Sequence, residues 1–320
     1  NHMRFTILGS GTSVPHSKRS SSGYWLETEN GSLMLDLSAS AVHRIAQEKL
    51  DWANLDAIWI SHFHLDHVGG LAPFLFGTKY APETQGRTKP LRVFGARGLR
   101  TLLEKFDAAG GYKLFAQPFP LEITEVEPLE KFAILEDLEA VALDTPHTPE
   151  SLAIHLRETG GKTLVYTADT GFTMTLGDFS RRADLLVMEC SFVKNKPVEK
   201  HLELAEAMHL ARYARPRRLV LTHLYPEWDA VDLVKEAEKF GKVNVIHTTA
   251  GEDYKSVPAP EELNFSADTD YIHYCSNETI HGVEFHHDLK PPAGVPVICD
   301  ASSHIYSRPM DFGRCAMWYA

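Results

Sequence analysis

The sequence predicts an α/β fold whose functional residues gather at one edge of a sheet. Short apolar runs of strand length alternate with longer segments of helical spacing. Residues with metal-ligand chemistry follow several of these runs or lie on the loops between elements: His62, His147, Asp169, His201 and His223. Loops at one end of a rigid sheet are where binding sites are built. We therefore expect these residues to share one site.

Composition excludes several classes of function. The chain has 320 residues and is 43% hydrophobic, which is enough for one large core or two domains. A net charge of −11 argues against general polyanion binding, so any contact with nucleic acid needs a local basic patch. No apolar run approaches the ~18 residues of a membrane helix and no signal peptide is visible, so we expect a cytoplasmic protein without a membrane partner. Of the four cysteines, only Cys190 lies in the first 250 residues, so no disulfide framework is expected there.

The chain opens with short strands joined by tight turns. A strand is predicted over Phe5–Leu8, and a hairpin around Asn30-Gly31 joins Tyr24–Glu27 to Ser32–Asp36. Between them, Gly9–Pro15 is a glycine-rich loop that lacks the Lys-Ser/Thr pair and the following helix of a phosphate-binding loop. We expect this loop to line the mouth of a metal site.

Asp36 ends an apolar strand, and the sequence leaves two roles open for it. A buried carboxylate at this place can hold a metal-binding loop by hydrogen bonds. It can equally cap the helix that is predicted from Ser40 onward.

The stretch Ser61–His67 contains the densest set of metal ligands in the chain. It follows Ala57–Ile60, an apolar run that reads as a buried strand, and has the pattern H-x-H-x-D-H. Imidazole nitrogen and carboxylate oxygen are ligands for zinc and related divalent ions. Alternating histidines on an extended loop can point to one ion, and the Asp-His pair that follows can reach a second.

The remaining elements continue the alternation. Helices are predicted over Ala41–Leu50, Gly98–Phe106, Glu203–Ala214 and Asp229–Phe240. Strands are predicted over Leu91–Phe94, 138–143, Ser151–Leu156, Thr163–Tyr166, Leu185–Glu189, Leu219–Leu221 and Val243–His247, and the segment Leu121–Leu143 indicates several short antiparallel strands.

With these residues in place, residues 3–255 resemble the metallo-β-lactamase superfamily and, within it, the ribonuclease Z-like phosphodiesterases. The matching residues are His62, His64, Asp66 and His67 in H-x-H-x-D-H, then His147, Asp169 in Ala-Asp-Thr-Gly, and His223 in Leu-Thr-His-Leu-Tyr-Pro. The resemblance implies a four-layer αββα sandwich in a hydrolase domain at residues 1–257. It also implies two metal sites, one of His62, His64 and His147 and one of Asp66, His67 and His223, with Asp169 bridging them.

His201 lies where ribonuclease Z-like proteins carry a histidine that faces the scissile phosphate; the alternative is a residue at a helix start with no role. Two features depart from ribonuclease Z. The interval from His147 to Asp169 is too short for a tRNA-binding arm, and the glycine usual after the position of Asp36 is replaced by Leu37. A phosphodiester smaller than tRNA is therefore the favoured substrate.

The resemblance and the charges together indicate a dinuclear metal-dependent hydrolase. Two divalent ions, with zinc favoured and manganese or iron as alternatives, lower the pKa of a shared water so that hydroxide forms near neutral pH. Asp66 can orient this hydroxide or take its proton, and a protonated His201 can stabilise or protonate the departing oxygen. The expected partner is RNA, a cyclic nucleotide or another small anionic phosphodiester. The alternative is a lactone, thioester or other carboxylic ester hydrolase on the same metal core, and the resemblance leaves a homodimer open.

Near the end of the chain, the segments Asp270–Phe285 and Val297–Ser303 are followed by Ser307-Arg308-Pro309. On these segments, residues 258–320 resemble a fragment of phosphoserine aminotransferase. In that family Asp300 would pair with the pyridine nitrogen of pyridoxal phosphate and Thr279 would touch the cofactor. The Schiff-base lysine would follow Ala320, so we expect no pyridoxal phosphate. A fragment of a larger sheet leaves strand edges unpaired, so a chimeric tail is favoured over a natural accessory module.

Overall fold

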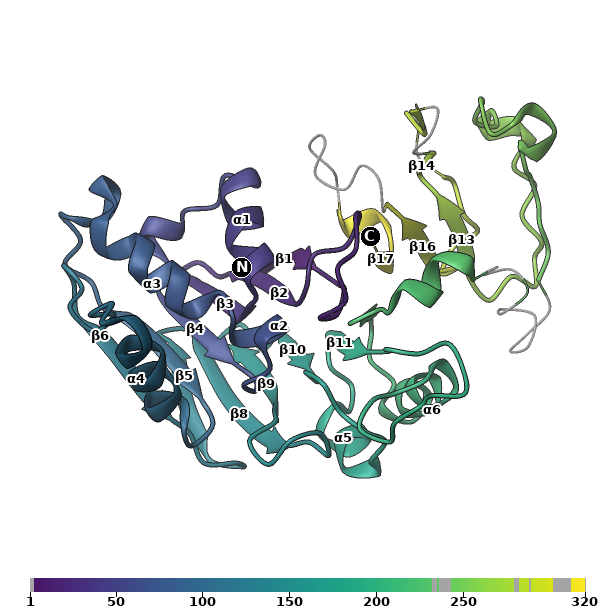
Figure 1. Ribbon diagram of the computed structural model, residues 1–320. Coiled ribbons are helices and arrows are strands. Elements are labelled where there is room, and N and C mark those ends of the chain that lie inside the picture. The colour runs from purple at the N-terminus through teal and green to yellow at the C-terminus, as the bar shows by residue number, and fades with distance from the viewer. Residues whose placement is uncertain are drawn as a thin grey trace. The chain divides into compact units, whose positions relative to one another are not determined.

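The computed structural model describes residues 3–231, 235, 243–278, 282–287, 289–301 and 312–319. The chain divides into two compact units, Asn1–Asp229 and Ala230–Ala320 (Figure 1). A boundary near Val257 between the hydrolase domain and the tail stays a prediction.

The first unit contains two six-stranded mixed sheets. The first sheet has the order β1 (Arg4–Gly9), β2 (Gly23–Glu27), β3 (Ser32–Leu37), β4 (Ala57–Ile60), β5 (Leu91–Gly95) and β6 (Leu121–Glu125). Strands β1 to β3 pair antiparallel, and β3 to β6 pair parallel. The predicted hairpin is therefore confirmed, whereas β6 runs parallel to β5 and was wrongly expected among antiparallel strands. Its short alternating pattern is common to both kinds of pairing, so the pattern alone did not separate them.

The second sheet repeats this arrangement, with antiparallel strands first and parallel strands later along the chain. Its order is β12 (Leu219–Thr222), β11 (Leu185–Glu189), β10 (Thr163–Tyr166), β9 (Leu152–Glu158), β8 (Leu138–Asp144) and β7 (Lys131–Leu135). Strands β7 to β10 are antiparallel, and β10 to β12 are parallel.

Helices cover the outer face of each sheet, so the unit has four αββα layers (Figure 1). The first sheet carries α1 (Ala39–Gln47), α2 (Leu65–Val68), α3 (Leu71–Tyr80) and α4 (Leu99–Gly110), and the second carries α5 (Met174–Phe179) and α6 (Leu204–Ala214). Short 3₁₀ turns lie at η1 (Trp52–Asn54), η2 (Pro82–Thr84) and η3 (Pro226–Ala230).

Strand β4 shows how the sequence fits these layers. All of its residues are buried. Trp59 belongs to the apolar cluster between the sheets, while Ile58 and Ile60 belong to the cluster under the helices. Because alternate side chains of a strand point to opposite faces, a continuous apolar run is what a strand needs when both faces are covered.

The second unit is built around a small parallel sheet of β13 (Ile272–Cys275), β16 (Val297–Asp300) and β17 (Met317–Tyr319). A two-stranded antiparallel pair, β14 (Asn277–Glu278) and β15 (Val283–Glu284), and the 3₁₀ turns η4 (Ala250–Glu252), η5 (Pro260–Glu262) and η6 (Phe312–Arg314) complete its described elements. Its apolar cluster is small and includes Ile272, Val297 and Cys299.

The end of the chain departs from the prediction in one segment. The strand predicted over Val243–His247 is wrong: the segment is irregular, Val245 is 56% exposed, and no strand in the described part of the chain pairs with it. Apolar alternation does not make a strand where no partner satisfies the backbone. Most of the predicted helix Asp229–Phe240 and the residue Thr279 lie outside the described residues.

The two sheets bring their loops together at one edge. The loop after β4 meets the start of β9 through a backbone hydrogen bond from Leu152 N to Ser61 O of 3.0 Å. The carboxyl ends of the parallel strands β10, β11 and β12 lead into Asp169, Glu189 and His223. Segments far apart in the sequence therefore meet at this edge.

Candidate metal centre

The loop after β4 presents its histidines from two kinds of backbone. His62 lies on the loop after the strand, and His64 is the residue that precedes α2, with an extended backbone. Asp66 and His67 lie within the single turn of α2. His62 and His67 are fully buried, whereas His64 is exposed. The loop thus offers nitrogen and oxygen atoms at different depths of one site.

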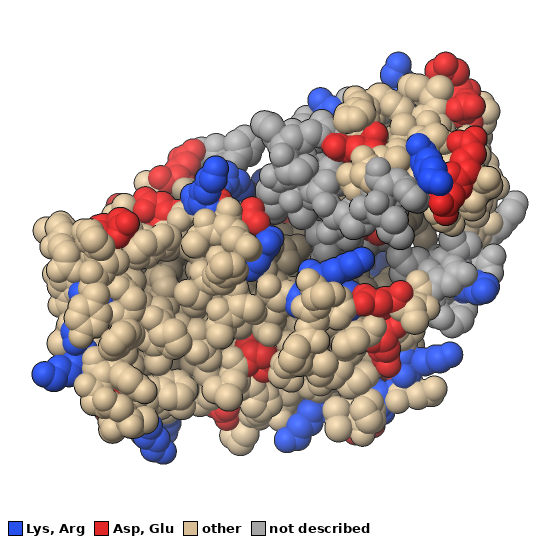
Figure 2. All heavy atoms as spheres, turned by 45° about the horizontal axis from the view of Figure 1, so that its top comes forward, with Lys and Arg blue, Asp and Glu red and all other residues tan. Residues whose placement is uncertain are grey.

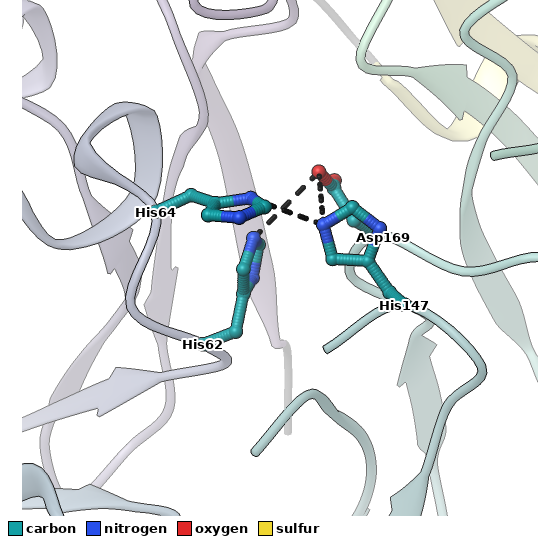
Figure 3. Close-up of side chains that lie close together, drawn as sticks. All are labelled: His62, His64, His147 and Asp169. Carbon is teal, nitrogen blue, oxygen red and sulfur yellow. Dashed lines mark hydrogen bonds and ion pairs between the residues drawn. The ribbon is translucent and has the colours of Figure 1, made fainter. Parts of the chain in front are cut away.

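All the predicted ligands meet in three overlapping groups, whose candidate ligand atoms lie within 4.8 Å of one another in each group. The groups are His62, His64, His147 and Asp169; Asp66, His67 and His223; and Asp169, His201 and His223. Figure 3 shows the first group, in which the side chains point toward a common centre. The division between the first two groups matches the predicted division between two metal sites, and the roles of the individual ligands stay predictions.

Asp169 lies between the first two groups. Its Oδ2 is 3.7 Å from His62 Nε2 and 3.2 Å from His223 Nε2, and its Oδ1 is 3.3 Å from His67 Nε2. Ligands bound at about 2.0–2.2 Å from one ion lie roughly 3–4 Å from each other. The spacing therefore fits a carboxylate shared by two ions.

Unpartnered buried atoms show that the side chains fit a pair of cations. His62 Nε2, His67 Nε2 and Asp169 Oδ1 are buried and have no hydrogen-bond partner. Buried polar atoms without a hydrogen bond are uncommon in folded proteins, and the shortest charged contact among these three atoms is the 3.3 Å ion pair of His67 Nε2 with Asp169 Oδ1. Burial raises the pKa of Asp169, but the charges of His223 and His67 outweigh burial and hold that pKa well below its usual range. The carboxylate is therefore ionised, as a metal ligand must be.

Four histidines of the cluster are oriented in the same way, with Nδ1 bound to the protein and Nε2 turned to the cluster. The Nδ1 partners are Ser61 Oγ for His62 at 3.1 Å, Asp36 Oδ2 for His67 at 2.7 Å, Lys200 O for His147 at 2.9 Å and Ser191 Oγ for His223 at 2.9 Å. A donating Nδ1–H leaves the lone pair on Nε2, which is the arrangement of metal-binding histidines.

The protein shifts the pKa values of His62 and His67 in opposite directions from their usual value. Burial, together with the neighbouring His67, lowers the pKa of His62 far below its usual range, so this ring is neutral. Burial also acts to lower the pKa of His67, but the charges of Asp169 and Asp36 outweigh it and raise the pKa well above its usual value. Metal binding at His67 would therefore displace a proton.

Asp36 holds the histidine loop by hydrogen bonds, which is one of the two roles predicted for it. Its buried carboxylate accepts hydrogen bonds from Ser61 N and Ser61 Oγ at 2.7 Å, from His67 Nδ1 at 2.7 Å and from Tyr166 OH at 2.6 Å. Ser38, not Asp36, caps α1 by accepting from Ala41 N.

Three residues at this edge have a left-handed backbone, a conformation that other residues of the chain also adopt elsewhere. Asp36, Ala168 and His223 have φ angles of 54°, 52° and 58°, in the left-handed region that residues with a Cβ rarely adopt. Each is a predicted site residue or precedes one. Such conformations persist where the surrounding contacts determine them, which is common at functional sites.

Glu189 and Ser191 are part of the site and were assigned no role from the sequence. The buried Glu189 carboxylate accepts from His201 Nδ1 at 2.8 Å and from Ser191 Oγ at 2.8 Å. Ser191 Oγ in turn accepts from His223 Nδ1. Glu189 thus orients His201 directly and His223 through one hydroxyl. The signal available in the sequence was its position at the end of an apolar strand, which it shares with Asp36.

The glycine-rich loop after β1 lies beside the site, as expected. Leu224 N donates to Ser10 O at 2.8 Å, directly after His223. Arg19, between this loop and β2, forms an ion pair of 2.8 Å with Asp229 of η3.

The four-layer fold and the His/Asp cluster define a metal-dependent hydrolase with the metallo-β-lactamase fold. The chain belongs to the family described as anti-Pycsar protein Apyc1, whose model matches residues 3–250. It is 27% identical to a ribonuclease Z of Methanosarcina acetivorans over 74% of this chain and 93% of the relative. The crystal structure of the metallo-β-lactamase fold protein YhfI from Bacillus subtilis superposes with a TM-score of 0.63 at 24% identity, covering 76% of this chain and 95% of that one.

A further similarity involves a different protein. The chain is 46% identical to phosphoserine aminotransferase of Pseudomonas fluorescens over 88 residues, which are 27% of this chain and 24% of the aminotransferase. The chain thus spans about a quarter of that relative, and the predicted resemblance to a fragment of it is confirmed.

Replacement of Asp36 tests the support of the histidine loop. In Asp36→Asn the amide keeps one acceptor oxygen and turns an NH₂ group toward several donors, so we expect a loss of roughly 2–4 kcal/mol in the free energy of unfolding. Metal affinity should fall about 10–100-fold, because His67 loses its orienting acceptor. Thermal unfolding and metal content after dialysis measure both effects.

The matched control is Asp56→Asn. Asp56 also accepts from a backbone amide, Ser32 N at 2.9 Å, but lies before β4, at the end opposite the histidine loop. This variant should retain its metal. An Asp36→Asn protein as stable and as metal-loaded as the unsubstituted protein would contradict the role of Asp36.

Proposed function

We propose that the protein is a dinuclear metal-dependent phosphodiesterase that acts on small phosphodiesters. The observation that carries the proposal is the position of His201. Its ring is oriented by the buried carboxylate of Glu189. A ring nitrogen of His201 lies within 4.8 Å of the candidate ligand atoms of Asp169 and His223. A carboxylate-bound histidine beside a metal centre is suited to donate a proton to an oxygen that leaves phosphorus. The similarity to a protein named ribonuclease Z supports the same chemistry.

The metal ions would be held by the seven predicted ligands: His62, His64, Asp66, His67, His147, Asp169 and His223. We propose zinc, which suits histidine and carboxylate ligands; manganese and iron suit them as well. When bound, such ions supply Lewis acidity and lower the pKa of water.

Two side chains would move protons. Burial acts to raise the pKa of Asp66, but its hydrogen bond with His223 and the charge of His67 outweigh burial and lower the pKa, so Asp66 is ionised and can orient or deprotonate the attacking water. Burial acts to lower the pKa of His201, but its hydrogen bond to Glu189 and the charge of Glu189 outweigh burial and raise it. The raised pKa favours the protonated ring, which can give its proton to the departing oxygen.

The surroundings of the site support a substrate smaller than tRNA. Strands β9 and β10, which link His147 to Asp169, are joined by the tight turn 159–162 and leave no room for an arm. On the face drawn in Figure 2, the described Lys and Arg side chains are interspersed with acidic ones and form no continuous basic surface. Among the described residues, no helix is long and apolar enough to cross a membrane.

A substrate panel separates phosphodiester from carboxylic ester chemistry. Metal-loaded protein should hydrolyse bis(p-nitrophenyl) phosphate and 2′,3′-cyclic nucleotides, and should leave a homoserine lactone and a precursor tRNA unchanged. Product release is followed by absorbance and chromatography, with Asp169→Asn as the inactive control. Lactone turnover without phosphodiester turnover would overturn the proposed function.

Removal of the His201 ring tests its role as an acid. A nitrophenolate leaves without a proton, whereas the alkoxide of a cyclic nucleotide needs one, so His201→Ala should lose about 10²–10⁴-fold in kcat on the cyclic nucleotide and much less on bis(p-nitrophenyl) phosphate. Metal content should not change. His209→Ala, on α6, is the control and should behave as the unsubstituted protein. Loss of metal from His201→Ala would show that His201 is a ligand instead.

A further inference from the structure

One short segment, residues 193–202, carries both His201 and a hydrogen-bond acceptor for His147; we call it the His201 strap. Its base is closed by two backbone hydrogen bonds, Phe192 N to Leu202 O at 3.1 Å and Leu204 N to Phe192 O at 2.9 Å. Between these anchors the strap is largely exposed. Contacts made by its few inward-facing groups must therefore set its position.

The strap reaches the metal centre at two points. The Lys200 carbonyl accepts from His147 Nδ1 at 2.9 Å, and the His201 ring donates to Glu189. It also lies close to the loop after Asp169, since a Cβ added at Gly171 would collide with the Glu199 carbonyl oxygen. A shift of the strap would move a predicted metal ligand and the predicted acid together.

Lys196 belongs to this strap and is partly buried, with its side chain more enclosed than its backbone. Its side chain is only 8% exposed, and its Nζ lies 2.8 Å from Glu206 Oε1 on α6, 3.1 Å from Glu199 Oε2 and 3.2 Å from the carbonyl oxygen of His201. Lysine is almost never buried unless it is paired. These partners use all three donors of the ammonium group, so Lys196 is not available to bind an anionic substrate.

We propose that Lys196 is a positioning residue that holds the His201 strap against α6. Through the His201 carbonyl it fixes the place of the proton donor, and through the adjoining Lys200 carbonyl it fixes the ring of His147. The part of the proposal that concerns turnover rests on the proposed phosphodiesterase function, whereas the part that concerns His147 does not.

The test compares Lys196→Met with Lys196→Arg and with Lys194→Met, an exposed lysine of the same strap. In Lys196→Met the affinity for Zn²⁺, measured by competition with a chromophoric chelator, should fall about 10-fold, because His147 loses a fixed acceptor. The kcat for a 2′,3′-cyclic nucleotide should fall roughly 10–100-fold with KM within about 2-fold, since the defect lies in positioning rather than in substrate binding. The absorption bands of the Co²⁺-loaded protein should shift. Lys196→Arg keeps the charge and should recover most of each loss, and Lys194→Met should show none.

Distinct outcomes overturn the proposal. Zn²⁺ affinity and kcat in Lys196→Met equal to those of Lys194→Met would show that Lys196 holds nothing in place. A rise in KM with kcat unchanged would show that it binds substrate. If Lys196→Met does not fold, Glu206→Gln weakens the same ion pair from α6 and should produce the same changes in smaller degree. If the unsubstituted protein cleaves no phosphodiester, the proposed function fails, and Zn²⁺ affinity still decides the role of Lys196.

Discussion

The buried carboxylate of Asp36 is the contact on which the site depends. It accepts from Ser61 and His67 of the first sheet and from Tyr166 of the second. A hydrogen bond of 2.6 Å between Tyr24 OH and Thr222 Oγ1 crosses between the sheets in the other direction. The cluster draws its side chains from both sheets, so its geometry is only as fixed as the spacing between them. Two buried tyrosines join the sheets through their hydroxyls, next to the apolar cluster that fills the space between them.

The same arrangement makes the metal-free site unfavourable in free energy. Imidazole nitrogens and a carboxylate oxygen are buried without hydrogen-bond partners, and three backbone positions near them are in the left-handed region. The rings are held in place by hydrogen bonds that they donate to Asp36, Ser191 and the Lys200 carbonyl. A scaffold of this kind binds metal with little reorganisation, because the ligands are already oriented, and metal binding in turn adds to the stability of the fold.

The sequence predicted the parts of this design that depend on local pattern. Without a structure, the sequence already indicated the H-x-H-x-D-H loop after an apolar strand and the polar residues at other strand ends. The family resemblance added the order of the layers and the expected division of ligands between two ions. The hydrogen bonds that orient the ligands could not be predicted. Glu189 and Ser191 orient His201 and His223, and Lys196 pairs with Glu206 of α6 as well as with Glu199 and the His201 carbonyl of its own strap. Such contacts depend on how the chain folds and leave no local pattern in the sequence. The strand predicted over Val243–His247 is wrong for a related reason. Alternating apolar residues favour a strand, but a strand forms only where another strand pairs with it.

Anomalous diffraction from metal-loaded crystals, with data on both sides of the zinc absorption edge, tests the central claim most directly. The account predicts two peaks per chain, one bounded by His62, His64 and His147 and the other by Asp66, His67 and His223, with Asp169 between them. A single peak, or peaks that do not touch Asp169, would contradict it.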